Sequence, residues 1–355
     1  MIDNLFTPLT LGDLRLRNRI LMAPMTRSRA GPEAMPTELM AEYYGQRASA
    51  GMIITEGISP SADGIGYCRT PGIYTDEQQA AWAEVVAAVH GKGGVIVAQI
   101  MHCGRIGHAL NKPANSELVA PSALAAQGEM YTDADGMQPF GEPRALTTDE
   151  IALVVREYAT ATERAYAAGF DGVELHCTSG YLPAQFLCTG SNRREDEYGG
   201  SVQNRVRFPL EVLRAMAEVD CSGRVGFRIA PDNRFNDVYD EDPRDTFAAF
   251  LAGASELNLA YVHSIRMPQG RVDNLQIAKD HFPGRVIANE SYSAEEAAQA
   301  IESGAADAVS FGRPFISNPD LVDRLWRDKP LAKTDFSTLY TPGAAGYTDY
   351  PFLSA

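Results

Sequence analysis

Eight polar side chains directly follow short apolar runs of the sequence, and their types set the range of chemistry to consider: Thr26, Glu56, Gln99, His102, His176, Arg228, His263 and Arg313. In a barrel of parallel strands, the residues at the carboxyl ends of the strands form the active site. A single residue of this kind often does no more than satisfy a loop carbonyl. Because nearly every run supplies one, the sequence predicts one polar pocket built from several strand ends.

Two kinds of chemistry fit these residues poorly. A Schiff-base aldolase needs a lysine at a strand end, but all the lysines lie in predicted helices or loops: Lys92, Lys112, Lys279, Lys329 and Lys333. A metal site needs ligands that converge. His102 and His108 have neither helical nor strand spacing, and no carboxylate follows His176 closely. We therefore predict no metal.

The last two apolar runs end in residues that suit a phosphate group. Segments 288–293 and 311–314 lie where barrels commonly bind phosphate. A helix is predicted to begin near Ser293, and its N–H groups and the fork of Arg313 could bind an anion. Glu290 opposes this unless its side chain turns aside.

Three other strand-end residues suit a heteroaromatic ring. Thr26, Gln99 and Arg228 can bond ring carbonyls and N–H edges, and Arg228 favours negative charge on the ring, as a reduced flavin anion requires. The residues thus favour a cofactor that carries both a ring and a phosphate.

The elements that position these residues alternate between strand and helix. Strands are predicted at 19–22, 52–55, 95–100, 172–175, 225–229, 260–263, 286–288 and 308–311. Capping boxes at Thr75, Thr147 and Ser293, and Asn318 followed by Pro319, predict helix starts between and after them. Eight such units predict a (β/α)₈ TIM barrel, an α/β fold, as a single domain over 1–355. An open, doubly wound sheet is the alternative.

Two segments depart from this alternation. Residues 103–146, a long insertion after the third strand, are rich in Pro, Gly, Asn and Ser, and so long an excursion is usually functional, for example as a lid. The tail 336–355 carries aromatic side chains without helical periodicity, which predicts that it packs back onto the barrel.

The composition limits the partners. The chain has 355 residues, 31 Lys and Arg against 46 Asp and Glu, and a formal net charge of −15, which disfavours nucleic acid and anionic membranes. No apolar stretch is long enough to cross a membrane and no secretory signal is visible. The five cysteines form no Cys-x-x-Cys pair. We expect a cytoplasmic enzyme, a monomer or homodimer, that acts on a small molecule.

Nine segments in order along the chain resemble the Old Yellow Enzyme family: 18–27, 99–105, 174–182, 185–187, 192–201, 204–208, 311–313, 318–321 and 346–351. The chain is most similar to the bacterial ene-reductase branch. This resemblance implies a flavin-dependent (β/α)₈ barrel that reduces activated alkenes, with tightly but non-covalently bound FMN and with NADPH or NADH as hydride donor.

The resemblance also implies roles for individual residues. The FMN site would comprise Pro24, Met25, Thr26, Gly57, Gln99, Arg228, Ser291, Gly312 and Arg313. His176 and Ser179 would bind the substrate oxygen, and Tyr181 would donate a proton. Tyr67, Met101 and Tyr347 would shape the substrate pocket.

Three positions depart from the family pattern. The substrate-binding pair is His with Asn or His three residues apart in the family, but it is His176 with Ser179 here. Met101 replaces a common aromatic residue, and Glu290 replaces a common glycine. The first two keep alternatives open: nitrate-ester denitration, desaturation or isomerisation of a dedicated substrate, or flavin binding without turnover.

Overall fold

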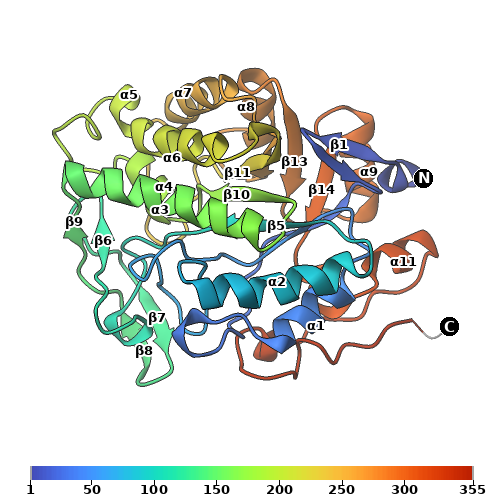
Figure 1. The fold of residues 1–355 in the computed structure, drawn as a ribbon. Coiled ribbons are helices and arrows are strands. Elements are labelled where there is room, and N and C mark those ends of the chain that lie inside the picture. Colours follow the sequence, from blue (N-terminus) through green and yellow to red (C-terminus); the bar gives the residue numbers. More distant parts are fainter. Residues whose placement is uncertain (1, 354–355) are drawn as a thin grey trace.

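Eight parallel strands form a closed barrel (Figure 1). Each strand pairs with the next barrel strand in the sequence, and the last pairs with the first through Val309 opposite Ile20. The computed structural model describes residues 2–353. This closure confirms the predicted barrel and excludes the open sheet.

The barrel strands lie within a few residues of their predicted positions: β3 (Ile20–Met22), β4 (Ile53–Ile54), β5 (Ile96–Ile100), β10 (Gly172–His176), β11 (Val225–Ile229), β12 (Tyr261–Ile265), β13 (Arg285–Asn289) and β14 (Ala308–Phe311). Nearly all of their residues are buried, because one face lines the barrel interior and the other faces the helices. That is why these segments are continuous apolar runs in the sequence.

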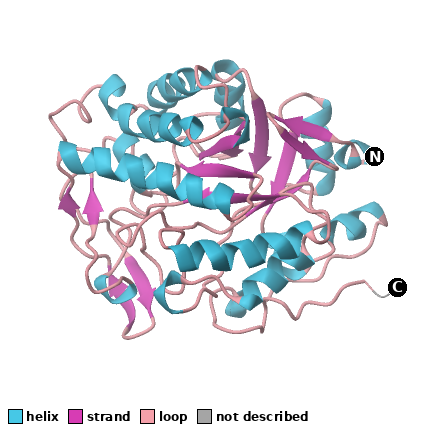
Figure 2. Ribbon diagram, viewed as in Figure 1, coloured by secondary structure: helices cyan, strands magenta, loops and turns pink. Residues whose placement is uncertain are grey.

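Helices surround the strands (Figure 2). They are α1 (Glu38–Gln46), α2 (Asp76–His90), α3 (Thr148–Ala167), α4 (Leu182–Leu187), α5 (Val202–Arg205), α6 (Arg207–Glu218), α7 (Pro243–Ser255), α8 (Asn274–His281), α9 (Ala294–Glu302), α10 (Arg313–Ser317) and α11 (Leu321–Trp326). The capping boxes predicted at Thr75, Thr147 and Ser293 are confirmed at the starts of α2, α3 and α9.

The predicted helix start at Asn318 and Pro319 is wrong. Asn318 ends α10, and α11 begins three residues later with Asp320 at its N-cap. The Asn318 amide donates to the carbonyl of Pro314 (2.8 Å), and its oxygen accepts from the N–H of Ala332 (2.7 Å). Asn318 therefore closes one helix instead of opening the next.

A two-stranded hairpin closes the amino-terminal end of the barrel. Strands β1 (Leu9–Leu11) and β2 (Leu14–Leu16) are antiparallel, and their leucines pack against Met52, Val97 and Tyr261. This apolar plug leaves the carboxyl end of the barrel for chemistry.

The insertion after β5 lies on the opposite side of the molecule from β1 (Figure 1). It contains the pair β6 (Val119–Ala120) and β9 (Arg144–Ala145) and the hairpin β7 (Glu129–Thr132) and β8 (Gly136–Pro139). Its residues Ile106 and Ala126 share an apolar cluster with Met101 and Tyr181. The insertion thus packs beside the residues at the carboxyl ends of β5 and β10.

The tail is anchored to the barrel around Tyr347, whereas its aromatic residues Phe336, Tyr340 and Phe352 are exposed. Residues 354–355 of the predicted tail lie outside the described residues. The Arg29 guanidinium donates to the carbonyls of Thr338, Leu339 and Ala345 at 2.7–2.9 Å. Tyr347 is fully buried and stacks on Tyr43 with ring centroids 4.0 Å apart. Arg29, which follows the first barrel strand, β3, therefore anchors the last segment of the chain.

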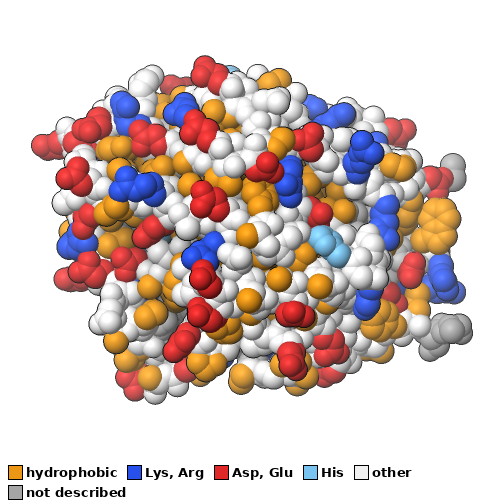
Figure 3. Space-filling view, in the orientation of Figure 1, with side chains coloured by type: hydrophobic (Ala, Val, Ile, Leu, Met, Phe, Trp, Pro, Cys, Tyr) orange, Lys and Arg blue, Asp and Glu red, His pale blue; other side chains and the backbone are white. Residues whose placement is uncertain are grey.

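Acidic and basic side chains are interspersed on the face seen in Figure 3, without a continuous basic area. Within residues 2–353, no helix has the length and apolar character needed to cross a membrane.

Candidate active site

One hollow opens at the carboxyl ends of the barrel strands. Its wide part has a volume of about 640 Å³ and its narrow part about 150 Å³, and the two share Pro24, Met25, Thr26 and Arg228. Predicted site residues lining the narrow part are Gly57, Gln99, Met101, His176, Ser179 and Tyr181, and those lining the wide part are Ser291, Gly312 and Arg313. The tertiary structure thus brings together residues spread over nearly the whole chain.

A network of buried polar side chains supports the floor of the hollow. Gln99 Nε2 donates to Glu174 Oε1 (2.7 Å), and Glu174 Oε2 lies 2.9 Å from Nδ1 of His263. Arg228 donates to Nε2 of His263 (2.6 Å) and to Oδ1 of Asn289 (2.6 Å). Because Glu174 holds the amide nitrogen of Gln99, the amide oxygen of Gln99 is left to accept a hydrogen bond from a ligand.

The charges of this network follow from burial. Burial and the charge of Arg228 lower the pKa of His263 to about 4, so this imidazole is neutral at pH 7. Burial lowers the pKa of Arg228 to about 10, and it remains a cation. Burial alone would raise the pKa of Glu174, but His263, Arg228 and Gln99 hold it below its usual value. With His263 neutral, Arg228 is the cation that balances this carboxylate.

His176 and Tyr181, the predicted oxygen-binding and proton-donating residues, lie together in the narrow part. Their rings meet edge to face with centroids 4.8 Å apart. Burial, followed by the charge of Arg228, lowers the pKa of His176 well below its usual value, so it is a neutral N–H donor. Burial raises the pKa of Tyr181 well above 10, so its hydroxyl keeps its proton.

Tyr67 lies behind Tyr181. The Tyr181 hydroxyl donates to that of Tyr67 (3.2 Å), which also accepts from Nδ2 of Asn236 (3.3 Å). Tyr67 therefore touches the predicted proton donor and not the hollow itself.

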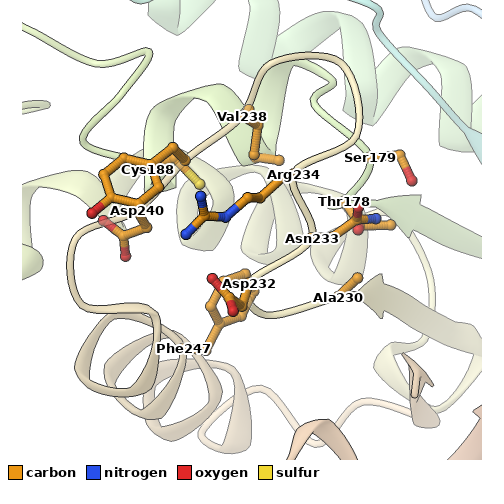
Figure 4. A pocket seen from close by; sticks show the side chains of 12 residues that line it. Thr178, Ser179, Cys188, Ala230, Asp232, Asn233, Arg234, Val238, Asp240 and Phe247 are labelled. Atoms are coloured by element: carbon orange, nitrogen blue, oxygen red, sulfur yellow. The ribbon is translucent and has the colours of Figure 1, made fainter. Parts of the chain in front are cut away.

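Ser179 occupies a turn in which its backbone has a φ of 58°, in the left-handed region. Its side chain borders both the narrow part of the hollow and a second cavity of about 10 Å³. Figure 4 shows that cavity, which the side chain of Arg234 crosses towards Cys188 and Asp240. Its volume corresponds to about one water molecule, so it leaves little room for a longer side chain at position 179.

The wide part of the hollow ends at Ser291 and Arg313. Nη2 of Arg313 donates to Oγ of Ser291 (2.7 Å) and also bonds the carboxylate of Glu290. At the start of α9, the N–H of Glu296 bonds the Ser293 hydroxyl (3.1 Å), and the N–H of Ser293 bonds the Glu296 carboxylate (2.8 Å). These two N–H groups of the predicted anion-binding helix start are satisfied within the helix. The side chains of Ser291 and Arg313 line the same part of the hollow and can also donate.

The structure separates Tyr347 from the predicted substrate pocket. Tyr347 is buried against Tyr43 and does not line the hollow, whereas Tyr340 of the same tail does. The cation–π contacts of Arg27 and Arg29 with the Tyr347 ring explain this placement. The aromatic residues of the tail were recognisable in the sequence. Which of them is buried against the barrel, as Tyr347 is, and which lines the hollow, as Tyr340 does, depends on the fold.

Other residues of the site were missed in the sequence. Phe235 lines the narrow part, and Asn289, Ser310 and Tyr340 line the wide part. Glu174 carried a usable signal, because it is a charged residue inside an apolar strand of which every residue is buried. The loop residues carried none, since no periodicity marks them.

Two predicted strand-end residues are structural. His102 is fully buried, accepts from the N–H of Gly104 at Nδ1 (3.0 Å), and burial lowers its pKa to about 3. Glu56 lies behind the hollow, where its Oε1 accepts from the Tyr44 hydroxyl (3.2 Å) and its own N–H donates to the same hydroxyl (2.9 Å).

Glu56→Gln is expected to change how stability depends on pH. Burial raises the pKa of Glu56 from 4.5 to about 7. Between these values the folded protein holds a proton that the unfolded chain has lost, so the contribution of Glu56 to stability falls as pH rises and is constant above about 7. This amounts to a change on the order of 3 kcal/mol. Thermal unfolding of both proteins from pH 4.5 to 7.5 should show their difference widening through this window; parallel curves would contradict it.

Comparisons with known proteins identify a family and similar proteins. The sequence model of the family described as "NADH:flavin oxidoreductase / NADH oxidase family" matches residues 4–332. A probable flavin mononucleotide-dependent alkene reductase of Leishmania infantum is 42% identical, over 99% of this chain and 98% of that protein. The 12-oxophytodienoate reductase 7 of Oryza sativa subsp. japonica is 38% identical, over 98% of this chain and 94% of that protein.

Solved structures agree with the fold. Morphinone reductase in complex with tetrahydroNAD superposes with a TM-score of 0.94 at 46% identity, over 99% of this chain and 98% of that chain. The old yellow enzyme homologue from Zymomonas mobilis has a TM-score of 0.94 at 40% identity, over 98% of this chain and 99% of that chain.

Proposed function

Because the chain belongs to the NADH:flavin oxidoreductase / NADH oxidase family, which includes the Old Yellow Enzymes, we propose that it reduces activated C=C bonds with bound FMN and with NADPH or NADH. The substrates are enones, maleimides and nitroalkenes. The observation that carries this proposal is the pairing of a neutral His176 donor with a protonated Tyr181 in one narrow hollow.

The residues of the hollow fit FMN. The oxygen of Gln99 can accept from the imide N–H of the ring, Arg228 can bond the adjacent ring edge, and Ser291 and Arg313 supply phosphate donors. Nδ1 of His176 is buried and has no hydrogen-bond partner within residues 2–353, which leaves its imidazole available to a ligand. When bound there, FMN would supply the hydride-transfer chemistry between the nicotinamide and the β-carbon of the alkene.

The protein side chains then act on the substrate. His176, as a neutral N–H donor, bonds the substrate oxygen on which negative charge develops; such a donor is worth about 3 kcal/mol in the transition state. Tyr181 donates its proton to the α-carbon as a general acid. Burial of both groups keeps them in these protonation states at neutral pH.

The visible spectrum of the purified protein tests the cofactor. Oxidised-flavin absorption that is released as FMN on denaturation supports the proposal, and a folded, colourless protein that fails to bind added FMN contradicts it. Steady-state assays with cyclohexenone, a maleimide and a nitrate ester then define the reaction. Nitrate-ester denitration is the second candidate, because Ser179 and Met101 stand at the wall where the family pattern has other residues.

Arg228→Ala is expected to weaken FMN binding and to lower the flavin midpoint potential by about 30 mV or more, which is 1.4 kcal/mol for a two-electron couple. The variant removes a buried cation that favours negative charge on the ring. Arg228→Lys keeps that charge, and its flavin midpoint potential is expected to lie between those of the wild type and Arg228→Ala. Potentiometric titration in the presence of a reference dye measures the change. Identical potentials in all three proteins would show that Arg228 does not act on the ring.

A further inference from the structure

We propose that Glu290 competes with the phosphate group of the cofactor for Arg313 and Ser291, and so lowers the preference of this protein for FMN over riboflavin. This inference rests on the proposed FMN site. The Glu290 carboxylate lies where the proposed phosphate-binding donors, Arg313 and Ser291, converge.

The backbone holds Glu290 in this place. Glu290 follows β13 with a φ of 88° and Ser291 has a φ of 54°, both in the left-handed region that glycine favours. Arg266 fixes the turn, because its Nε donates to the carbonyl of Glu290 (2.7 Å) and its Nη2 to that of Ser291 (2.5 Å). The guanidinium of Arg266 also stacks over the ring of Tyr292 at 3.7 Å. Arg266 thus holds the backbone of this turn, while the partly exposed side chain of Glu290 can rearrange.

The carboxylate binds two of the donors that a phosphate would use. Oε1 of Glu290 accepts from Nη2 of Arg313 (2.5 Å) and from the hydroxyl of Ser291 (2.6 Å). Nη2 of the nearby Arg266 is engaged by the Ser291 carbonyl and the Glu296 carboxylate (3.2 Å). To bond Nη2 of Arg313 and the Ser291 hydroxyl, a phosphate must therefore displace the Glu290 carboxylate.

Displacement leaves a negative side chain beside the phosphate dianion. The side chains of Glu290 and Arg313 are 45% and 54% exposed, so water screens their charges and the cost is moderate. The exposure also lets Glu290 swing aside without burying its charge. We expect a penalty of about tenfold in the dissociation constant for FMN, and none for riboflavin, which carries no phosphate.

The test compares flavin binding to apoprotein by quenching of flavin fluorescence, at fixed ionic strength. Glu290→Gln removes the charge and keeps the size of the side chain, whereas Glu290→Gly also relieves the positive φ. Glu295→Gln is the matched control, because Glu295 is an exposed carboxylate five residues further along the chain, at the start of α9 and outside the hollow. Each protein is titrated with FMN and with riboflavin, and the rate of FMN release is measured in parallel.

We expect Glu290→Gln to bind FMN about tenfold more tightly and to release it more slowly, with riboflavin affinity changed by less than about twofold and Glu295→Gln like the wild type. Three results would overturn the inference: unchanged FMN affinity in Glu290→Gln, equal tightening of FMN and riboflavin, or tightening in Glu290→Gly alone. The last would assign the effect to the backbone. Failure of the wild type and of every variant to bind either flavin would overturn the FMN site itself.

Discussion

Tyr181→Phe is expected to slow the reduction of simple enones by about 100- to 10,000-fold, the usual contribution of a positioned general acid. Reduction of the enzyme by NAD(P)H needs no proton from this hydroxyl and should keep its rate. Stopped-flow absorbance separates the two half-reactions and measures each rate.

The structure makes this substitution a selective one. Phenylalanine keeps the edge-to-face contacts with His176 (4.8 Å) and Tyr67 (6.2 Å), so the pocket retains its shape. It removes the hydroxyl whose pKa burial raises well above 10. Tyr181→Phe therefore removes the hydroxyl proton and keeps the packing of the ring.

Two further variants complete this test. Tyr131→Phe removes an exposed tyrosine hydroxyl of the β7–β8 hairpin outside the hollow and should behave as the wild type. Tyr67→Phe removes the partner of the Tyr181 hydroxyl and should have a smaller effect than Tyr181→Phe. Equal slowing of both half-reactions in Tyr181→Phe, or of neither, would remove Tyr181 from the role of proton donor. Strongly activated alkenes, which water can protonate, should be least affected.

Ser179→Asn is expected to raise kcat/KM for cyclohexenone by up to about a hundredfold, corresponding to one gained donor of about 3 kcal/mol to the substrate oxygen. Asparagine also tolerates the φ of 58° at this position better than most residues do. Because the cavity behind Ser179 has a volume of only about 10 Å³, the longer side chain should extend towards the ligand.

Phenols that mimic the enolate measure the same effect without turnover. Titration of the long-wavelength charge-transfer band with a para-substituted phenol should show tighter binding to Ser179→Asn and weaker or equal binding to Ser179→Ala, at equal FMN content. Phenol affinity and enone turnover in Ser179→Asn that are unchanged or lower than in the wild type would contradict the hypothesis that Ser179 is too short to donate to the substrate oxygen. That outcome would favour a dedicated substrate that needs the space beside Ser179.

The sequence by itself determined the alternation of strands and helices and the set of chemical groups, whereas the pairing of the last barrel strand with the first decided between a closed barrel and an open sheet. Continuous apolar runs indicate strands that are buried on both faces, and capping boxes indicate helix starts through local hydrogen bonds. The strands and these helix starts could therefore be predicted without tertiary information. The strand-end residues Gln99, His176 and Arg228 were identified in the same way, because the position of a residue at a strand end follows from its neighbours in the chain.

The tertiary structure alone decided which of these groups meet, and in which state. Tyr340, and not Tyr347, reaches the hollow, because Arg27, Arg29 and Tyr43 bind the Tyr347 ring from a distant segment. Asn318 ends a helix because its oxygen accepts a hydrogen bond from Ala332.

The protonation states and the conflict at the phosphate end have the same origin. His176 is neutral and Tyr181 protonated because burial removes the water that would stabilise their charged forms. Glu290 opposes an anion only because the fold places Arg313 and Ser291 against it. Local sequence specifies secondary structure and residue type. Desolvation and long-range contacts exist only once the chain has folded, and they determine the protonation states of the buried side chains and which side chains line the hollow.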